Sequence, residues 1–163
     1  MKKNIIILLL TFCCIVHAQQ NTSTSYTYRP LSEFHLDTLR FLRTNFMEQS
    51  MHFHGKTVGE VLKYYEKDLP INIVYSDATS PYINPKGKSY METISISFYT
   101  YEYFYSALKS SNVPIIFFKI YLAKPFLDDY KFWFNMPEFE TDREEAWYMK
   151  DLPVDRIEVY RRF

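Results

Sequence analysis

The sequence is poor in glycine and cysteine, and it carries no excess of charge of either sign. Its 163 residues include three glycines and two cysteines, with 19 basic and 19 acidic side chains. So little glycine excludes a collagen-like or glycine-rich disordered chain, and it disfavours phosphate loops built from several glycines. The balanced charge lacks the basic excess typical of nucleic-acid-binding proteins, so we expect no nucleic-acid partner. A chain of this length favours a single domain.

Residues 1–18 have the pattern of a secretory signal peptide. Lys2 and Lys3 precede an apolar run over 5–16, and Ala18 offers a small residue for cleavage. The run is shorter than the roughly 20 residues that a membrane-spanning helix needs. An uncleaved N-terminal anchor and lipid attachment at Cys13 or Cys14 are the alternatives. We expect an exported protein, located in a periplasm or at a cell surface.

Removal of this segment changes the chemistry that remains. Cleavage after Ala18 takes away both cysteines, Lys2 and Lys3, which leaves a net charge of −2. The mature chain then offers no disulfide, thiol nucleophile or thiolate metal site, and no transmembrane span is expected in it. Aromatic residues, 19% of the sequence, must supply much of its core.

Residues 19–30 are polar and are expected to form a flexible leader before a single domain at 31–163. Helical spacing over 31–50 predicts a first helix, which Ser32 or Asp37 could cap. Its apolar stripe comprises Leu36, Leu39, Leu42 and Phe46. Thr57 and Glu60 form a capping box that predicts a second helix, and Pro70 ends it.

The rest of the chain predicts strands and one more helix. Strands are expected at 71–75, at 93–99 with Thr93, Ser95 and Ser97 on a polar outer face, and at 115–122, the sheet centre. A capping box at Thr141 predicts a helix to about Lys150, before a final strand at 154–161. The sequence therefore predicts an α+β fold in two layers. Two N-terminal helices pack on a mainly antiparallel sheet of about four strands, and a late helix precedes the last strand.

Two histidines are the most metal-like feature. On an extended segment, His52 and His54 would point the same way and could bind zinc or copper, with His35 or a carboxylate completing the site. Half-exposed histidines without a metal are the simpler alternative. Gly55 and Lys56 resemble the end of a phosphate loop, but the glycine required five residues earlier is Ser50. No cofactor is expected.

A series of tyrosines gives the clearest candidate for a binding surface. If the strand at 93–99 continues, Tyr99, Tyr101, Tyr103 and Tyr105 share one face, and Trp133 belongs to a second aromatic cluster. Such a face could bind a protein partner or stack on a glycan, because tyrosine is enriched at interface hot spots. Packing within the sheet is the structural alternative.

These features favour a small exported, non-enzymatic binding module whose ligand is a partner protein or a glycan. A narrower alternative is an inhibitor or immunity-type protein that neutralises a secreted enzyme. A metal-dependent hydrolase using His52, His54 or His35 is a third possibility, although no established catalytic motif supports it.

Overall fold

The computed structural model describes residues 25–78, 90–110, 112–124, 127–128 and 134–162. The predicted signal peptide therefore lies outside the described residues. The elements are η1 (Leu31–Phe34, a 3-10 helix), α2 (Thr38–Leu42), η2 (Arg43–Met47, a π-helical turn), α3 (Ser50–Phe53), α4 (Val58–Tyr65), β1 (Ile73–Ala78), β2 (Tyr90–Ser97), α5 (Tyr101–Lys109), β3 (Ile115–Leu122), β4 (Leu127–Asp128), α7 (Asp142–Tyr148) and β5 (Val154–Arg162).

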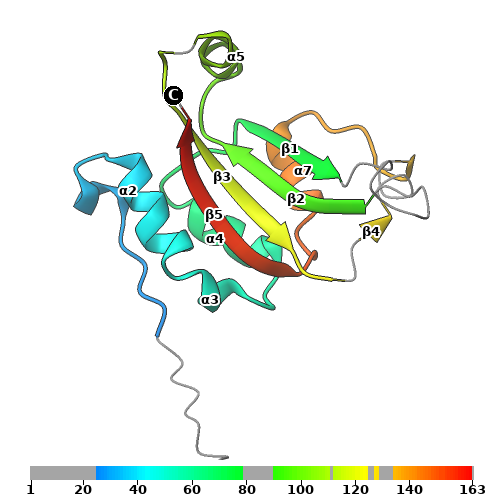
Figure 1. The fold of residues 1–163 in the computed structure, drawn as a ribbon. Helices are drawn as coiled ribbons and strands as arrows, with labels where there is room; N and C mark the ends of the chain where they lie inside the picture. The colour runs from blue at the N-terminus through cyan, green and yellow to red at the C-terminus, as the bar shows by residue number, and fades with distance from the viewer. Residues whose placement is uncertain (1–24, 79–89, 111, 125–126, 129–133, 163) are drawn as a thin grey trace, which may run out of the picture.

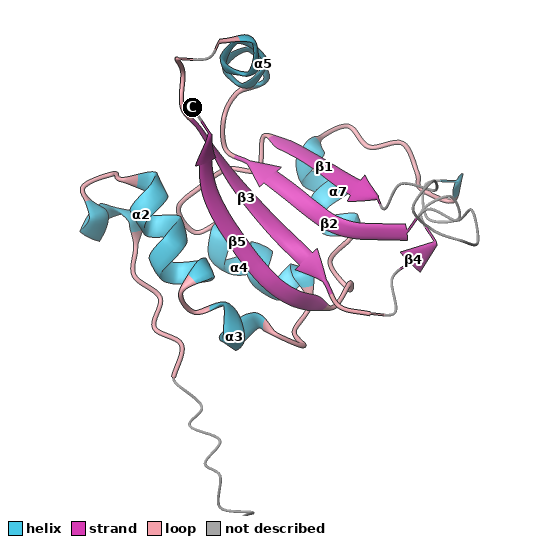
Figure 2. Ribbon diagram, viewed as in Figure 1, coloured by secondary structure: helices cyan, strands magenta, loops and turns pink. Residues whose placement is uncertain are grey.

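The strands form one antiparallel sheet in the order β1-β2-β3-β5, and the two-residue β4 pairs with β2. This confirms the predicted α+β class, and β3 lies at the sheet centre as expected. Figure 1 shows α4 and α7 behind the sheet, while α5 stands beyond the end where β2 leaves it. Figure 2 shows α5 apart from the other helices, at the end of the strands. The late helix α7 precedes the last strand, as the capping box at Thr141 predicts.

The main hydrophobic core fills the space between the sheet and these helices. Alternate residues of β3 and β5 point into it, because successive side chains of a strand face opposite sides. Phe118 and Ile120 of β3 meet Ile157 and Val159 of β5 there, and all four are buried. The inward pair Ile157 and Val159 is therefore confirmed. Aromatic rings from the helices interlock in the same core, among them Phe41, Phe46, Phe53 and Tyr65.

The second face of the sheet differs from the polar face expected for β2. Thr93, Ser95 and Ser97 are all buried, because these short side chains lie between larger ones on the neighbouring strands. Ser95, for example, pairs with Tyr75 on one side and Lys119 on the other. On the core face of β3, Phe118, Ile120 and Leu122 are buried. On its other face Ile115 is buried, and the alternate residues from Phe117 to Tyr121 are half-buried.

A smaller apolar cluster lies at one end of this second face. Phe104 and Ala107 of α5 contact Ile73 and Ile115 there. This packing buries one side of α5 and leaves its other side in solvent. The sequence did not predict α5, so the connection between β2 and β3 differs from the expected strand continuation.

The N-terminal helical region is also more broken than predicted. The expected helix over 31–50 is divided into η1, α2, η2 and α3. Asp37 is the cap of α2, since its carboxylate accepts a hydrogen bond from the Arg40 N–H at 3.0 Å. Leu42 and Phe46 are buried as expected, but Leu36 lies outside the helix and is exposed. The second helix is the predicted one, with its capping box present and Glu60 accepting from the Thr57 N–H at 3.1 Å.

The expected flexible leader includes residues that the fold holds in place. Tyr26 and Tyr28, within the described part of 19–30, pack against the main core. Within the parts of the chain described by the structure, no helix is both long enough and apolar enough to cross a membrane.

Candidate functional site

Helix α5 places the predicted tyrosines differently from a strand. Thr100 caps α5 by accepting a hydrogen bond from the Tyr103 N–H at 3.4 Å, so the chain turns into a helix directly after Tyr99. The expectation that the four tyrosines continue strand β2 on one face is therefore wrong. Tyrosines two residues apart point in different directions on a helix, whereas those four apart are neighbours.

The tyrosines form two ring pairs instead of one row. The rings of Tyr99 and Tyr103 stack with their centroids 4.8 Å apart and an angle of 22° between their planes. The ring centroids of Tyr101 and Tyr105 are 4.3 Å apart. Tyr101, Tyr103 and Tyr105 are 60%, 41% and 42% exposed. We call Tyr99, Tyr101, Tyr103, Tyr105 and Leu36 the α5 aromatic surface.

The Tyr99–Tyr103 pair borders a pocket of about 410 Å³. Aliphatic and aromatic groups form most of its wall, and Arg161 supplies a cation. Tyr99 is fixed at this wall because its hydroxyl oxygen accepts a hydrogen bond from the Ile116 N–H at 3.2 Å. The pocket is lined by Leu36, Asp37, Thr38, Leu39, Phe98, Tyr99, Tyr103, Pro114, Ile116 and Arg161.

Leu36 is the unusual residue of this pocket. It is 74% exposed and has a φ of +66°, and the preceding His35 has a φ of +51°. Side chains other than glycine, asparagine and aspartate seldom adopt this left-handed conformation, and such strain is typical of functional sites. The helical spacing predicted that Leu36 belongs to the apolar stripe that faces the core. Nothing in that spacing indicated that Leu36 would be exposed at the edge of a pocket.

Two tyrosine hydroxyls of this surface, those of Tyr99 and Tyr105, have raised pKa values, which favours their neutral form. Burial raises the pKa of Tyr99, and a hydrogen bond with Tyr101 raises the pKa of Tyr105. Neutral hydroxyls can both donate and accept hydrogen bonds, so the surface combines apolar rings with polar tips. Trp133, the other predicted binding residue, lies outside the described residues.

The two histidines do not converge on one point. His52 is in helix α3 and stacks on Tyr26 with a centroid distance of 4.2 Å. His54 follows that helix, and its Nδ1 lies 2.9 Å from the Asp155 carbonyl oxygen and 3.6 Å from the Asp155 carboxylate. The extended conformation expected for 52–54 is therefore wrong, because a helical turn separates the two rings.

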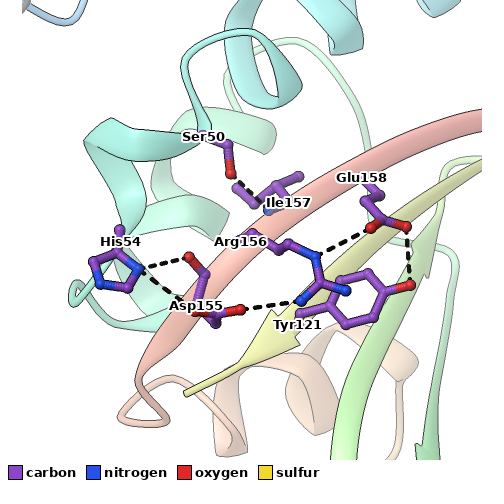
Figure 3. A network of polar contacts seen from close by, with 7 residues as sticks. All are labelled: Ser50, His54, Tyr121, Asp155, Arg156, Ile157 and Glu158. Atoms are coloured by element: carbon purple, nitrogen blue, oxygen red, sulfur yellow. Dashed lines mark hydrogen bonds and ion pairs between the residues drawn. The ribbon is translucent and has the colours of Figure 1, made fainter.

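His54 belongs to a polar network along β5 (Figure 3). Arg156 lies 3.7 Å over the Tyr121 ring, and Asp155 and Glu158 bind its guanidinium at 3.0 and 3.1 Å. Tyr121 donates to Glu158 at 2.9 Å, and burial together with this carboxylate raises the pKa of Tyr121.

This network borders a pocket of about 700 Å³. Asp155, Arg156 and Glu158 bind one another along β5, and Tyr121 of β3 joins them through its hydroxyl and its ring. The network therefore links β5 to β3, and the Ser50 hydroxyl of α3 accepts a hydrogen bond from the Ile157 N–H of β5 at 2.8 Å.

A metal site finds no support in the part of the chain that the structure describes. No three His, Cys, Asp or Glu side chains come together there as a metal ion would require. Of the predicted site residues, the structure places Tyr99 and Tyr103 with Leu36 at one pocket and pairs Tyr101 with Tyr105 elsewhere on α5. His52 and His54 contact different partners. Comparison with known proteins gives no match to a family model, to a curated protein or to a solved structure.

Proposed function

We propose that this chain is an exported, non-enzymatic binding module that captures a partner protein through the α5 aromatic surface. One observation carries the proposal. Three exposed tyrosines lie on a helix that packs on one side only, next to a pocket at whose rim a strained leucine is held in solvent.

The ring pairs suit an interface because they are ordered before binding. A tyrosine has two side-chain torsions, and stacking on a neighbour restricts both, so little further entropy is lost in a complex. Tyr101 and Tyr105 restrain each other in this way, as do Tyr99 and Tyr103. Exposed apolar groups that gather in one place are also typical of interaction sites on soluble domains.

The pocket beside these rings favours a protein over a glycan. Leu39, Phe98 and Pro114 give it an apolar wall, which suits the anchoring side chain of a partner protein. A sugar ring needs many hydrogen-bonding groups around its hydroxyls as well as an aromatic platform. Binding to glycans is therefore the alternative outcome of the experiment below.

Capture from the exported fraction of the source cells tests the proposal. The wild-type chain and a variant with Tyr101, Tyr103 and Tyr105 changed to alanine serve as baits, and captured proteins are identified by mass spectrometry. Tyr148→Ala is the matched control, since Tyr148 is 39% exposed and lies on α7. We expect a partner that the wild type and the control retain and the triple variant loses, with a Kd at least tenfold weaker for the purified pair.

Two outcomes would redirect this proposal. If the triple variant retains every partner, or if it unfolds at a much lower temperature than the wild type, the tyrosines serve the fold. If a glycan array binds the wild type and no protein does, the ligand is a sugar. A partner that is an enzyme and loses activity on binding would make the chain an inhibitor.

Export needs its own measurement. We expect expression of the full chain in a bacterial host to give an exported product that begins at Gln19, which intact-mass analysis of the exported fraction detects. A product that retains residues 1–18 in the cytoplasm would contradict export. Ala18→Leu should slow cleavage, because signal peptidases require a small residue at that position.

A further inference from the structure

A second candidate site lies on helix α4, away from the α5 aromatic surface. Lys56, Lys63 and Lys67 line a pocket of about 390 Å³ together with Glu60 and Tyr64. Lys56, Glu60, Lys63 and Lys67 follow one another at intervals of four, three and four residues, so they share one side of the helix and its extensions.

Aromatic rings hold Lys67 in place. Its Nζ lies 4.5 Å from the ring centroid of Tyr28 and 4.5 Å from that of Tyr64. The centroids of the two rings are 5.8 Å apart, so the one ammonium lies against both aromatic rings at once. Such contacts attract the charge without neutralising it, which leaves the N–H groups able to bind an anion.

A histidine holds Lys56 at the other end of the pocket. The Lys56 Nζ lies 2.6 Å from the His52 Nε2, and the His52 ring stacks on Tyr26. Burial and the adjacent ammonium lower the pKa of His52, which favours the neutral imidazole, and a neutral ring nitrogen can accept a hydrogen bond from the Lys56 ammonium. Lys56 is therefore positioned by an imidazole and not by a carboxylate.

The local charge is not balanced by carboxylates. None of the three lysines forms an ion pair within 4.0 Å among the residues that the structure describes. Glu60, the acidic residue of the pocket wall, already accepts the Thr57 N–H in the capping box. The pocket wall therefore carries three lysine ammonium groups and one carboxylate, that of Glu60. It is an electropositive region on a mature chain whose expected net charge is −2.

From these contacts we infer that the α4 pocket binds a small ligand that carries two or more phosphate or sulfate groups. A single phosphate or sulfate group could contact only some of the three lysines. Lys63 and Lys67 are about one helical turn apart, roughly 6 Å along the axis, and Lys56 lies beyond the other end of the helix. A ligand with several anionic groups can contact all three lysines at once. This inference does not depend on the partner protein proposed above.

Titration calorimetry with inorganic tripolyphosphate tests the site on the wild-type chain. The measurement is made at about 0.01 M and about 0.15 M ionic strength, where charges are screened over about 30 Å and 8 Å. We expect measurable binding at the lower value and clearly weaker binding at the higher one. Orthophosphate, with one phosphate group, should bind at least tenfold more weakly than tripolyphosphate.

Matched variants connect any binding to this pocket. Lys63→Gln should weaken tripolyphosphate binding about fivefold, since one contact with a unit charge in water is worth about a factor of five. The double change Lys63→Gln and Lys67→Gln should weaken it by about 25-fold if the two contacts are independent. Lys109→Gln is the control, because Lys109 is also an exposed lysine in the last turn of a helix, namely α5. Lys63→Arg should preserve most of the affinity.

A second experiment distinguishes a free anionic ligand from the headgroup of a lipid. Sedimentation with phosphatidylcholine vesicles, with and without a phosphorylated inositol lipid, asks whether a lipid headgroup can occupy the pocket. Binding to these vesicles that the double variant loses would support the site with a membrane source. If neither tripolyphosphate nor the vesicles bind, or if Lys109→Gln weakens binding as much as Lys63→Gln does, the inference is overturned.

Discussion

The side-chain amide of Asn45 binds the backbone of Arg29 in both directions. Its Oδ1 accepts from the Arg29 N–H at 2.8 Å, and its Nδ2 donates to the Arg29 carbonyl at 2.9 Å. Gln49, four residues later, binds Thr27 in the same way at 3.0 and 3.1 Å. Two amides from one helical segment thus pair with alternate residues of the chain that enters the domain.

Asn45→Ala should lower the free energy of unfolding by about 2–3 kcal/mol, because Asn45 is fully buried and its loss leaves backbone groups without partners. Gln49→Ala is the matched comparison. It removes the same pattern of bonds, but water can replace them because the Thr27 side is exposed, so we expect less than about 1 kcal/mol. Urea denaturation of both variants measures this, and equal losses would contradict it.

Leu36→Asn should stabilise the fold while it weakens capture of the proposed partner. Asparagine tolerates the left-handed conformation that leucine adopts at a cost of about 1 kcal/mol, so the unfolding free energy should rise by about 0.5–1 kcal/mol. The same change removes an apolar group from the rim of the pocket. A partner affinity that does not change, measured beside the thermal unfolding temperature, would remove Leu36 from the proposed surface.

Gly59→Ala should destabilise the protein, although alanine favours a helix by about 1 kcal/mol over glycine. An added Cβ would lie 3.1 Å from the Lys150 Cβ and 3.2 Å from the Lys150 carbonyl oxygen, where α4 meets the segment before β5. Crowding of this kind costs about 1–3 kcal/mol, so the net change should be a loss of about 1 kcal/mol.

Gly55 provides the contrasting case, since nothing lies within 4 Å of its added Cβ but its φ is +74°. Gly55→Ala should therefore cost about 1 kcal/mol through conformation alone, and Gly55→Asn should cost less. Chemical denaturation of the three variants separates the two causes. A stabilised Gly59→Ala would show that Lys150 moves aside.

Stability should depend on pH through His52. Its pKa lies below the ordinary value of 6.5 in the folded chain, because of burial and the Lys56 ammonium, although Glu60 opposes this. Below pH 6.5 the unfolded chain therefore binds more protons, so the contribution of His52 is complete above pH 6.5 and is lost as pH falls through the folded value.

We expect a decline in the free energy of unfolding below pH 6.5 that is shallower in His52→Gln. Lys56→Gln should also make it shallower, since it removes an ammonium that lowers the pKa of His52. NMR titration of the imidazole gives the direct readout. A His52 that titrates at or above 6.5 in the wild type would contradict the contact with Lys56.

Local signals in the sequence predicted the elements that local chemistry controls. The capping residues Thr57 and Thr141 begin their helices where expected, because a cap depends only on residues within one turn. The apolar run at 115–122 is a strand with the predicted bounds, although only alternate residues of its second half are fully buried. The tyrosine series failed because residues at every second position also include pairs four apart, such as Tyr101 and Tyr105, and these fit a helix equally well.

The sequence by itself determined the α+β class, the mainly antiparallel sheet of about four strands and the wealth of aromatic residues available for the core. Only the tertiary structure decided which of those residues reach solvent. Packing of Phe104 against the sheet turns Tyr101 and Tyr105 outward, and a left-handed turn places Leu36 beside Tyr103. Leu36 and Tyr103 line the same pocket although they are more than sixty positions apart in the chain. No local pattern encodes such an arrangement, because it depends on which face of each element the core covers.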